Sequence, residues 1–105
     1  MKSKLVELCA EMFDIHPRDL MGPYRFGFLT RARFALYKAL RIRGWSYSAI
    51  GTFVGGRDHT TIIYGVRRAE YFMERNPAYA AKIKALSESR PASITDWAEE
   101  ETHEG

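Results

Sequence analysis

The sequence is poor in the features that would tie it to a disulfide, a metal or a membrane. It contains one cysteine, Cys9, so no internal disulfide can form, and no second cysteine supplies a metal-ligand spacing. No apolar run approaches the roughly 20 residues needed to span a bilayer, and no secretory signal is apparent. We therefore expect a protein of the reducing cytoplasm that has no membrane partner.

Signatures of catalysis are also missing. No nucleophile, base and orienting residue form a recognisable set, and a metal site would need ligands from distant segments. No phosphate-binding loop of the GxxxxGK[ST] type is present. We expect a protein that is not an enzyme, uses no cofactor and binds no nucleotide. His16 and His103 are isolated and carry no assignment.

Charge is distributed unevenly along the 105 residues. All 16 Lys and Arg lie within residues 1–92 together with 8 of the 13 acidic residues, so this part carries a net charge of +8, and the last 13 residues carry −5. A domain this basic suggests a polyanionic partner, because Lys and Arg neutralise phosphates and release their counterions. Charge alone equally fits a solvated surface without a partner.

Hydrophobic periodicity predicts an all-α fold, a compact bundle of five or six helices without strands. Caps, prolines and glycines place the helices at residues 3–13, 16–21, 30–43, 46–54, 58–75 and 76–87. Thr30 is the expected cap of the third helix. The loop 22–28 carries aromatic side chains that we expect to pack beneath it, with stacking on nucleic acid as the alternative: Tyr24, Phe26 and Phe28.

The predicted domain spans residues 1–88. From residue 89 the sequence is polar, acidic and without periodicity, so residues 89–105 are predicted to form a disordered tail. Because the tail and the domain carry opposite charge, we expect the tail to compete with phosphates for the basic surface of the domain.

The most informative stretch is GGRDHTT, residues 55–61, between the fourth and fifth predicted helices. Its glycines suit a tight turn, and Asp58 is expected to cap the next helix by accepting a backbone N–H. Gly51 inside the fourth helix is expected to permit close packing. Apolar residues then recur on one face of the fifth helix, at Ile62, Val66, Ala69 and Met73. The pattern predicts a helix-turn-helix with polar groups on the first turn, where a helix entering a DNA groove meets base edges.

From about Leu5 to Leu86 the sequence resembles the C-terminal DNA-binding domain of DnaA, the bacterial replication initiator, a bundle of the Trp-repressor-like type. The match is strongest over residues 46–70. The resemblance implies that Asp58, His59 and Thr60 contact bases in the major groove of a short asymmetric duplex site. It also implies contacts to the DNA backbone by Thr61, Tyr64, Arg31 and Arg33.

This sequence differs from the family in two features. The family's loop before the third helix is usually rich in arginine and sends one into the minor groove, whereas this loop offers only Arg25. The ATP-binding module of an initiator is absent, so we expect no origin melting by this chain alone. Charge and position add four further candidates for phosphate contact: Lys38, Arg57, Arg67 and Arg68.

Each candidate also has a purely structural explanation. Asp58 can act as a helix cap, His59 and the two threonines can be ordinary first-turn residues, and Arg67 with Arg68 can be a solvated pair. The functions that remain open are three. The first is a stand-alone, sequence-specific duplex-DNA-binding protein of a bacterium or its phage, which regulates replication initiation or transcription at the nucleoid, with replication proteins as further partners. The second is a module that keeps the fold and acts mainly through a protein partner. The third is a basic helical protein that coats nucleic acid without preference.

Overall fold

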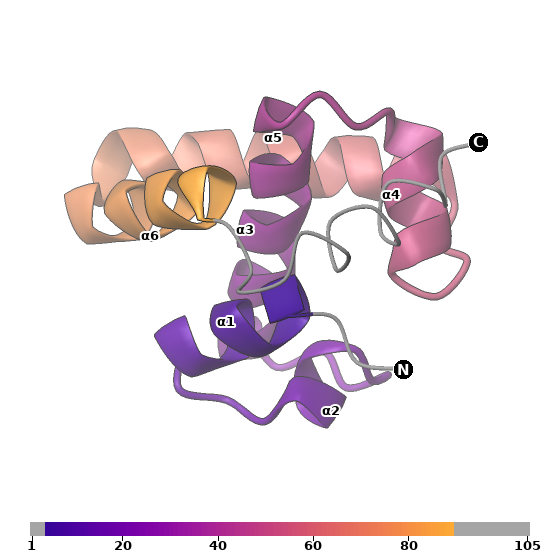
Figure 1. The fold of residues 1–105 in the computed structure, drawn as a ribbon, viewed down its shortest axis with the longest axis horizontal. Helices are drawn as coiled ribbons and strands as arrows, with labels where there is room; N and C mark the ends of the chain where they lie inside the picture. Colours follow the sequence, from indigo (N-terminus) through magenta and orange to yellow (C-terminus); the bar gives the residue numbers. More distant parts are fainter. Residues whose placement is uncertain (1–3, 90–105) are drawn as a thin grey trace.

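The computed structural model describes residues 4–89, and all the regular secondary structure of this part is helical, as the sequence predicts. Its helices are α1 Lys4–Met12, α2 Pro17–Leu20, α3 Gly27–Ile42, α4 Tyr47–Phe53, α5 His59–Arg75 and α6 Pro77–Glu88 (Figure 1). The predicted acidic tail lies outside the described residues, apart from Ser89. Between residues 4 and 89, no helix has the length and apolar character needed to cross a bilayer.

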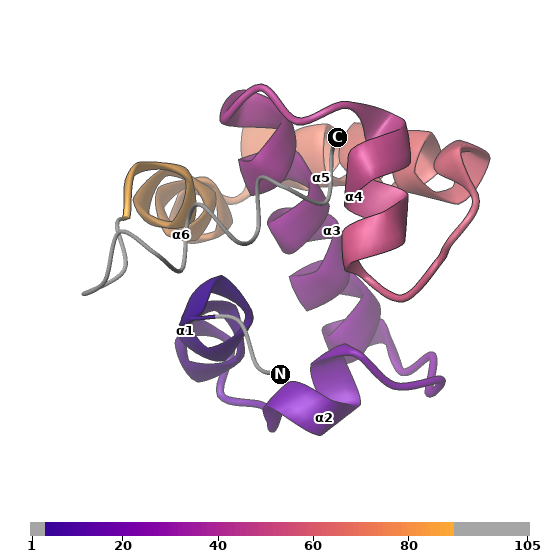
Figure 2. The same cartoon turned by 45° about the vertical axis from the view of Figure 1, so that its right-hand side comes forward.

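Helix α3 is the centre of the bundle, and every other helix packs against it (Figures 1 and 2). Three alanines on α3 are fully buried, at Ala32, Ala35 and Ala39, and their small side chains let neighbouring backbones approach closely. Helix α5 crosses α3 at Gly65, where an added Cβ would lie 2.7 Å from ring carbons of Phe34 and of Tyr37. The position of α5 on α3 therefore depends on the absence of a side chain at one residue.

Most of the apolar face predicted on the fifth helix lies in the core. On α5, Ile62, Val66 and Ala69 are buried, and Met73 is partly buried against them. On α3, Tyr37 and Leu40 are buried as well. Trp45, which the periodicity did not assign, lies 2% exposed between α3 and α4, with its ring edge-to-face against Phe53 at 5.3 Å. A large aromatic side chain directly after a helix-ending glycine therefore joins two helices of the bundle.

Most predicted helix boundaries agree with the structure to within a residue or two, and the start of the third helix is the exception. Phe26 is its N-cap, while Thr30, the expected cap, donates from Oγ1 to the carbonyl of Gly27 at 2.9 Å inside the first turn. The helix starts predicted at residues 46 and 76 agree with the structure, where Ser46 and Asn76 are N-caps whose side chains each accept a backbone N–H from the first turn that follows.

The loop aromatics are the other departure from expectation. Tyr24, Phe26 and Phe28 do not pack beneath the loop; each is about 60% exposed. The buried apolar side chains nearby are instead the aliphatic residues Leu20 of α2 and Leu29 of α3.

Candidate nucleic-acid interface

The turn between α4 and α5 is built on glycines. Gly55 and Gly56 have φ values of 104° and 84°, a conformation that side chains rarely adopt. The carbonyl of Gly51 accepts the N–H groups of Gly56 and Arg57, each at 2.9 Å. A Cβ at Gly51 would collide with the carbonyl oxygen of Arg57, so the predicted close packing at Gly51 is confirmed.

Asp58 begins α5, but its side chain is not the cap that the sequence predicts. The backbone carbonyl of Asp58 accepts the N–H groups of Thr61 and Ile62 at 3.0 and 3.3 Å, whereas the carboxylate makes no capping hydrogen bond. Its Oδ1 lies instead 3.4 Å from Nδ1 of His59, with 67% of the Asp58 side chain exposed. Because the carboxylate turns away from the helix N-terminus, it projects into solvent.

The first turn of α5 presents an uninterrupted polar tip. Asp58, His59, Thr60 and Thr61 are all exposed, whereas Ile62 directly after them is completely buried. The side chains that the sequence predicts for base contact therefore stand together at the surface, held by a helix whose opposite face is anchored in the core.

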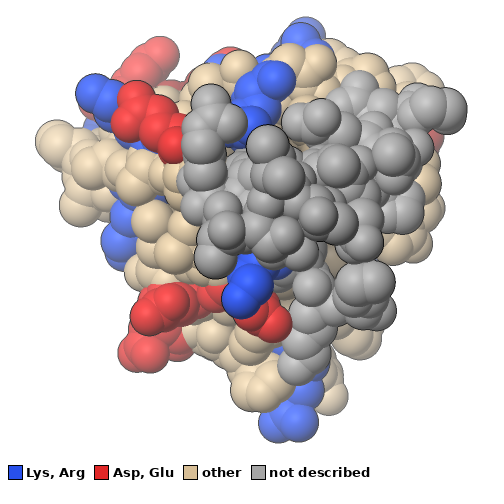
Figure 3. All heavy atoms as spheres, in the orientation of Figure 1, with Lys and Arg blue, Asp and Glu red and all other residues tan. Residues whose placement is uncertain are grey.

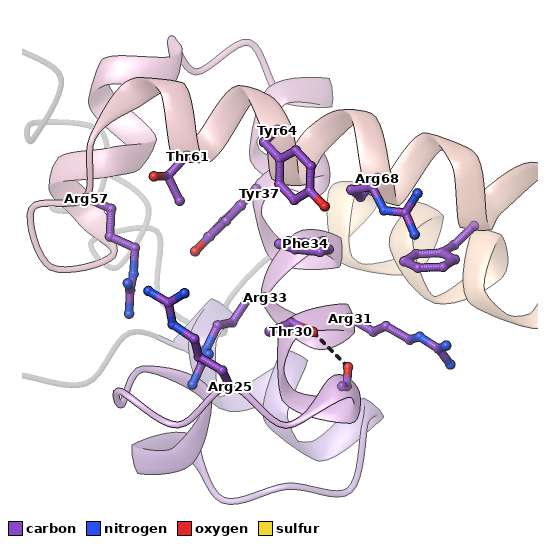
Figure 4. A pocket seen from close by; sticks show the side chains of 12 residues that line it. Arg25, Thr30, Arg31, Arg33, Phe34, Tyr37, Arg57, Thr61, Tyr64 and Arg68 are labelled. Carbon is purple, nitrogen blue, oxygen red and sulfur yellow. Dashed lines mark hydrogen bonds between the residues drawn. The ribbon is translucent and has the colours of Figure 1, made fainter.

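A groove of about 550 Å³ lies beside this tip, between the α2–α3 connection, α3 and the start of α5 (Figure 4). Five arginines line it and no Asp or Glu does: Arg25, Arg31, Arg33, Arg57 and Arg68. Thr61 and Tyr64 of α5 also line it. On the face seen in Figure 3, in contrast, basic and acidic side chains are interspersed. The charged side chains in the lining of the groove are thus all positive.

The arginines in the groove influence one another electrostatically. Burial lowers the pKa of Arg33, and the positive charges of Arg57 and Arg25 lower it further. Burial also raises the pKa of the Tyr37 hydroxyl, and the charges of Arg57 and Arg33 oppose that rise. Since like charges gather here without a carboxylate in the lining, a bound anion would relieve their repulsion.

Arg33 occupies a different place from the one predicted. It is only 7% exposed, and its guanidinium donates to the carbonyls of Leu20 at 2.7 Å and of Asp19 and Gly22 at 2.8 Å each. These carbonyls belong to the end of α2 and the residues after it. In the structure, Arg33 holds α2 and the following connection against α3, and its contact with a DNA phosphate stays a prediction.

Arg57 links the same connection to the helix-turn-helix. Its guanidinium donates to the carbonyl of Gly22 at 3.4 Å, and Figure 2 shows the α2–α3 connection and the α4–α5 turn on the same side of the molecule. Two arginines from different elements, Arg33 and Arg57, thus converge on one backbone carbonyl. The wall of the groove is fixed relative to the polar tip by these contacts.

The other predicted phosphate contacts divide into two groups. Arg31 and Arg68 line the groove and place their guanidinium groups 5.0 and 4.9 Å from the ring centre of Phe72. Arg67 is exposed outside the lining. Lys38 forms an ion pair, with its Nζ 2.8 Å from Glu70 of α5 and its side chain only 20% exposed.

Five lining residues were not predicted for the site: Gly27, Thr30, Phe34, Tyr37 and Phe72. Three of them recur at positions i, i+4 and i+7 on α3, so they share one helix face. That spacing is visible in the sequence, but the apolar members also fit a core-facing stripe, and only the packing shows that the stripe forms the floor of a groove. Among residues 4–89, no three His, Cys, Asp or Glu side chains are placed to hold a metal ion.

The fold and the site define a helix-turn-helix domain in which an exposed polar helix tip adjoins an arginine-lined groove. Residues 3–69 match the family model described as the bacterial dnaA protein helix-turn-helix. The chain belongs to this family, and so carries a DNA-binding helix-turn-helix of the DnaA type, as its sequence predicts.

Similar proteins are full-length initiators. The chromosomal replication initiator protein DnaA of Cereibacter sphaeroides is 38% identical over 78 residues, and that of Anaplasma marginale is 40% identical over 78 residues; each match covers 73% of this chain and 17% of the relative. The protein of the same name from Ruegeria sp. is 34% identical over 84 residues, which cover 79% of this chain and 18% of the relative. The chain thus spans less than a fifth of the length of these relatives.

Proposed function

We propose that this domain binds duplex DNA sequence-specifically, at a site similar to a DnaA box, with the first turn of α5 in the major groove. The observation that carries the proposal is the exposure of all four side chains from Asp58 to Thr61 beside the arginine-lined groove. An aspartate accepts a hydrogen bond from the cytosine amino group, and a threonine contributes a hydroxyl and a methyl group. Asp58, His59 and Thr60 are therefore assigned to base contacts.

The groove is assigned to the DNA backbone. Arg31, Arg57 and Arg68 supply charge, and Thr61 and Tyr64 supply hydroxyl groups from the same lining. Arg67 is exposed on α5 and extends this surface. Contacts of this kind position a protein on the duplex without specifying sequence. Arg25 at the mouth of the groove is the residue assigned to the minor groove.

The relatives named as replication initiators support a role at the same kind of site. We propose that the domain occupies initiator-type sites at the nucleoid and thereby regulates replication initiation or transcription. Competition measures this role: the chain should displace a full-length bacterial DnaA from a duplex containing the selected site, and it should displace it less well when Thr60 is replaced.

A binding selection with random duplexes, using the full chain, tests base recognition. Thr60→Ala should reduce the preference for the selected site over a scrambled duplex about tenfold, because one good base contact is lost. Thr52→Ala, an exposed threonine on α4, is the matched control and should keep the preference. An unchanged selected site in Thr60→Ala would refute the assignment.

Two other outcomes would favour the remaining functions. Equal affinity for selected and scrambled duplexes, falling steeply with salt, indicates a protein that coats nucleic acid. Absence of duplex binding at about 100 mM salt, with capture of a protein instead, indicates a module that acts through a protein partner.

A further inference from the structure

Three aromatic rings stand in a row on the surface of the α2–α3 connection and the first turn of α3. The ring centres of Tyr24 and Phe26 are 6.1 Å apart with planes 23° apart, and those of Phe26 and Phe28 are 6.0 Å apart with planes 8° apart. Their exposed fractions are 59%, 60% and 60%. We call these three residues the aromatic row.

The aromatic row adjoins the groove without lining it. Phe26 is the N-cap of α3, with φ −63° and ψ 144°, and Phe28 lies in the first turn of that helix. Arg25 and Gly27 line the groove, whereas the residues of the row do not. One short segment therefore carries both a cation that lines the groove and three largely exposed aromatic rings.

Aromatic side chains dominate the exposed apolar surface of the described residues. Of the six large hydrophobic side chains exposed there, only Ile42 is aliphatic, and three of the other five form the aromatic row. Nearly parallel rings offer flat π faces, which every nucleobase can stack on regardless of sequence. A spacing of about 6 Å is wider than the 3.4 Å between stacked bases, so the row suits a stretched strand with one base for each ring.

We propose that the aromatic row binds single-stranded DNA by stacking on unpaired bases, while Arg25 and the adjoining groove attract its phosphates. The combination of ring faces with a positive groove along the backbone path is the general chemistry of sequence-independent single-strand binding. Because the groove is positively charged, it favours single-stranded DNA over a neutral protein or a neutral lipid surface. The inference goes beyond duplex recognition, and it does not require that the tip of α5 contact bases.

The test is fluorescence anisotropy of the full chain with a labelled oligo(dT). Replacing Tyr24, Phe26 and Phe28 together by alanine should weaken binding at least about tenfold, and Phe26→Ala alone about fivefold. Phe26→Leu should weaken binding as Phe26→Ala does, whereas Phe26→Trp should retain or strengthen it, because stacking needs a π face. Tyr71→Ala, an exposed aromatic on α5, is the matched control.

The substituted side chains are largely exposed, so circular dichroism and urea unfolding should show an intact fold in each variant. Oligo(dT) binding unchanged by the triple substitution, or absent in the unsubstituted chain, overturns the proposal. A triple substitution that weakens binding only to vesicles of phosphatidylcholine and phosphatidylglycerol also overturns it. The same holds if the triple substitution changes the oligomeric state in sedimentation experiments and leaves the oligo(dT) affinity unchanged. Thr60→Ala should leave oligo(dT) binding intact, so failure of the duplex assignment is separately visible.

Discussion

The arginines around the groove have the same charge and different tasks. Arg33 is buried and hydrogen-bonded to three backbone carbonyls, whereas Arg31, two positions earlier on α3, is exposed and touches the ring of Phe72. Hydrogen bonds from a charged donor to buried carbonyls stabilise a fold more than an exposed cation does. The two residues therefore separate stability from binding.

Arg33→Ala should lower the free energy of unfolding by about 2–4 kcal/mol, because the hydrogen bonds that hold the end of α2 are lost. Arg31→Ala should change it by less than about 0.5 kcal/mol and should instead weaken all duplexes alike, with a salt slope smaller by about 1. Urea unfolding and anisotropy at several salt concentrations measure the two effects. A stable Arg33→Ala domain with weakened DNA binding would return Arg33 to the phosphate contacts.

Cys9 should make the domain sensitive to alkaline pH. Its thiol is fully buried, donates to the carbonyl of Ala32 at 3.6 Å, and burial raises its pKa to about 12 from an ordinary value of 9.0. Above that ordinary value the unfolded chain loses the proton while the folded chain keeps it, so stability falls as pH rises from about 9 toward about 12. Burial raises the pKa of Tyr79 as well, and this adds to the loss at higher pH.

Urea unfolding between about pH 8 and about pH 10 should show a loss of roughly 1 kcal/mol attributable to Cys9. Cys9→Ala removes the titrating group, so this variant should be less stable throughout and should show a smaller fall over the same range. Equal pH dependence in both proteins would contradict the assignment to Cys9.

Among the helices, the pair α4 and α5 depends on one close approach. The carbonyl of Gly51 holds the turn by accepting two N–H groups, and its Cα faces the carbonyl of Arg57 without space for a side chain. A glycine inside a helix ordinarily costs about 1 kcal/mol relative to alanine. At Gly51 the same glycine allows the close approach that forms the turn before the polar tip.

Gly51→Ala should therefore destabilise the domain by at least about 2 kcal/mol and weaken duplex binding, because the turn must move away from α4. Gly27→Ala is the matched control: an added Cβ there meets nothing within 4 Å, and its φ is not positive. Gly27→Ala should leave stability unchanged or raise it by up to about 1 kcal/mol. Thermal unfolding of both variants decides between a steric role and simple helix propensity at Gly51.

For the molecule as a whole, charge is distributed asymmetrically along the sequence. Residues 1–92 carry +8 and the last 13 residues carry −5. A tethered anionic segment competes with DNA phosphates at high effective concentration. This competition is electrostatic and weakens as salt increases.

Deletion of residues 90–105 should tighten binding to nonspecific duplexes several-fold at low salt, and the difference should shrink at about 300 mM salt. A chain of unchanged length with Asp96, Glu99, Glu100, Glu101 and Glu104 replaced by Asn or Gln separates charge from bulk. If neither variant differs from the unsubstituted chain in anisotropy titrations, the tail does not compete for the basic surface.

The helices and the core were largely predictable because they depend on local signals. Periodic apolar residues assigned the buried face of α5, and capping residues placed the starts of α4 and α6. The start of α3 was missed because Phe26 makes no side-chain cap and Thr30 offered a stronger local signal. The absence of a side-chain cap at Asp58 was missed for a related reason. Asp58 is the N-cap residue, as its local preference predicts, but its carboxylate lies beside His59 and makes no capping hydrogen bond.

What the sequence by itself determined is the all-α fold, the DnaA family and the polar stretch at the start of α5, because each depends on residues close together in the chain. Only the tertiary structure decided which cations are available. Arg33 and Lys38 are engaged by groups 11 to 32 residues away, whereas Arg25, Arg31, Arg57 and Arg68 from separate segments form one groove. Packing also turned three loop aromatics outward. Which group each arginine or lysine contacts depends on distances in the folded chain, and those distances cannot be derived from local sequence patterns.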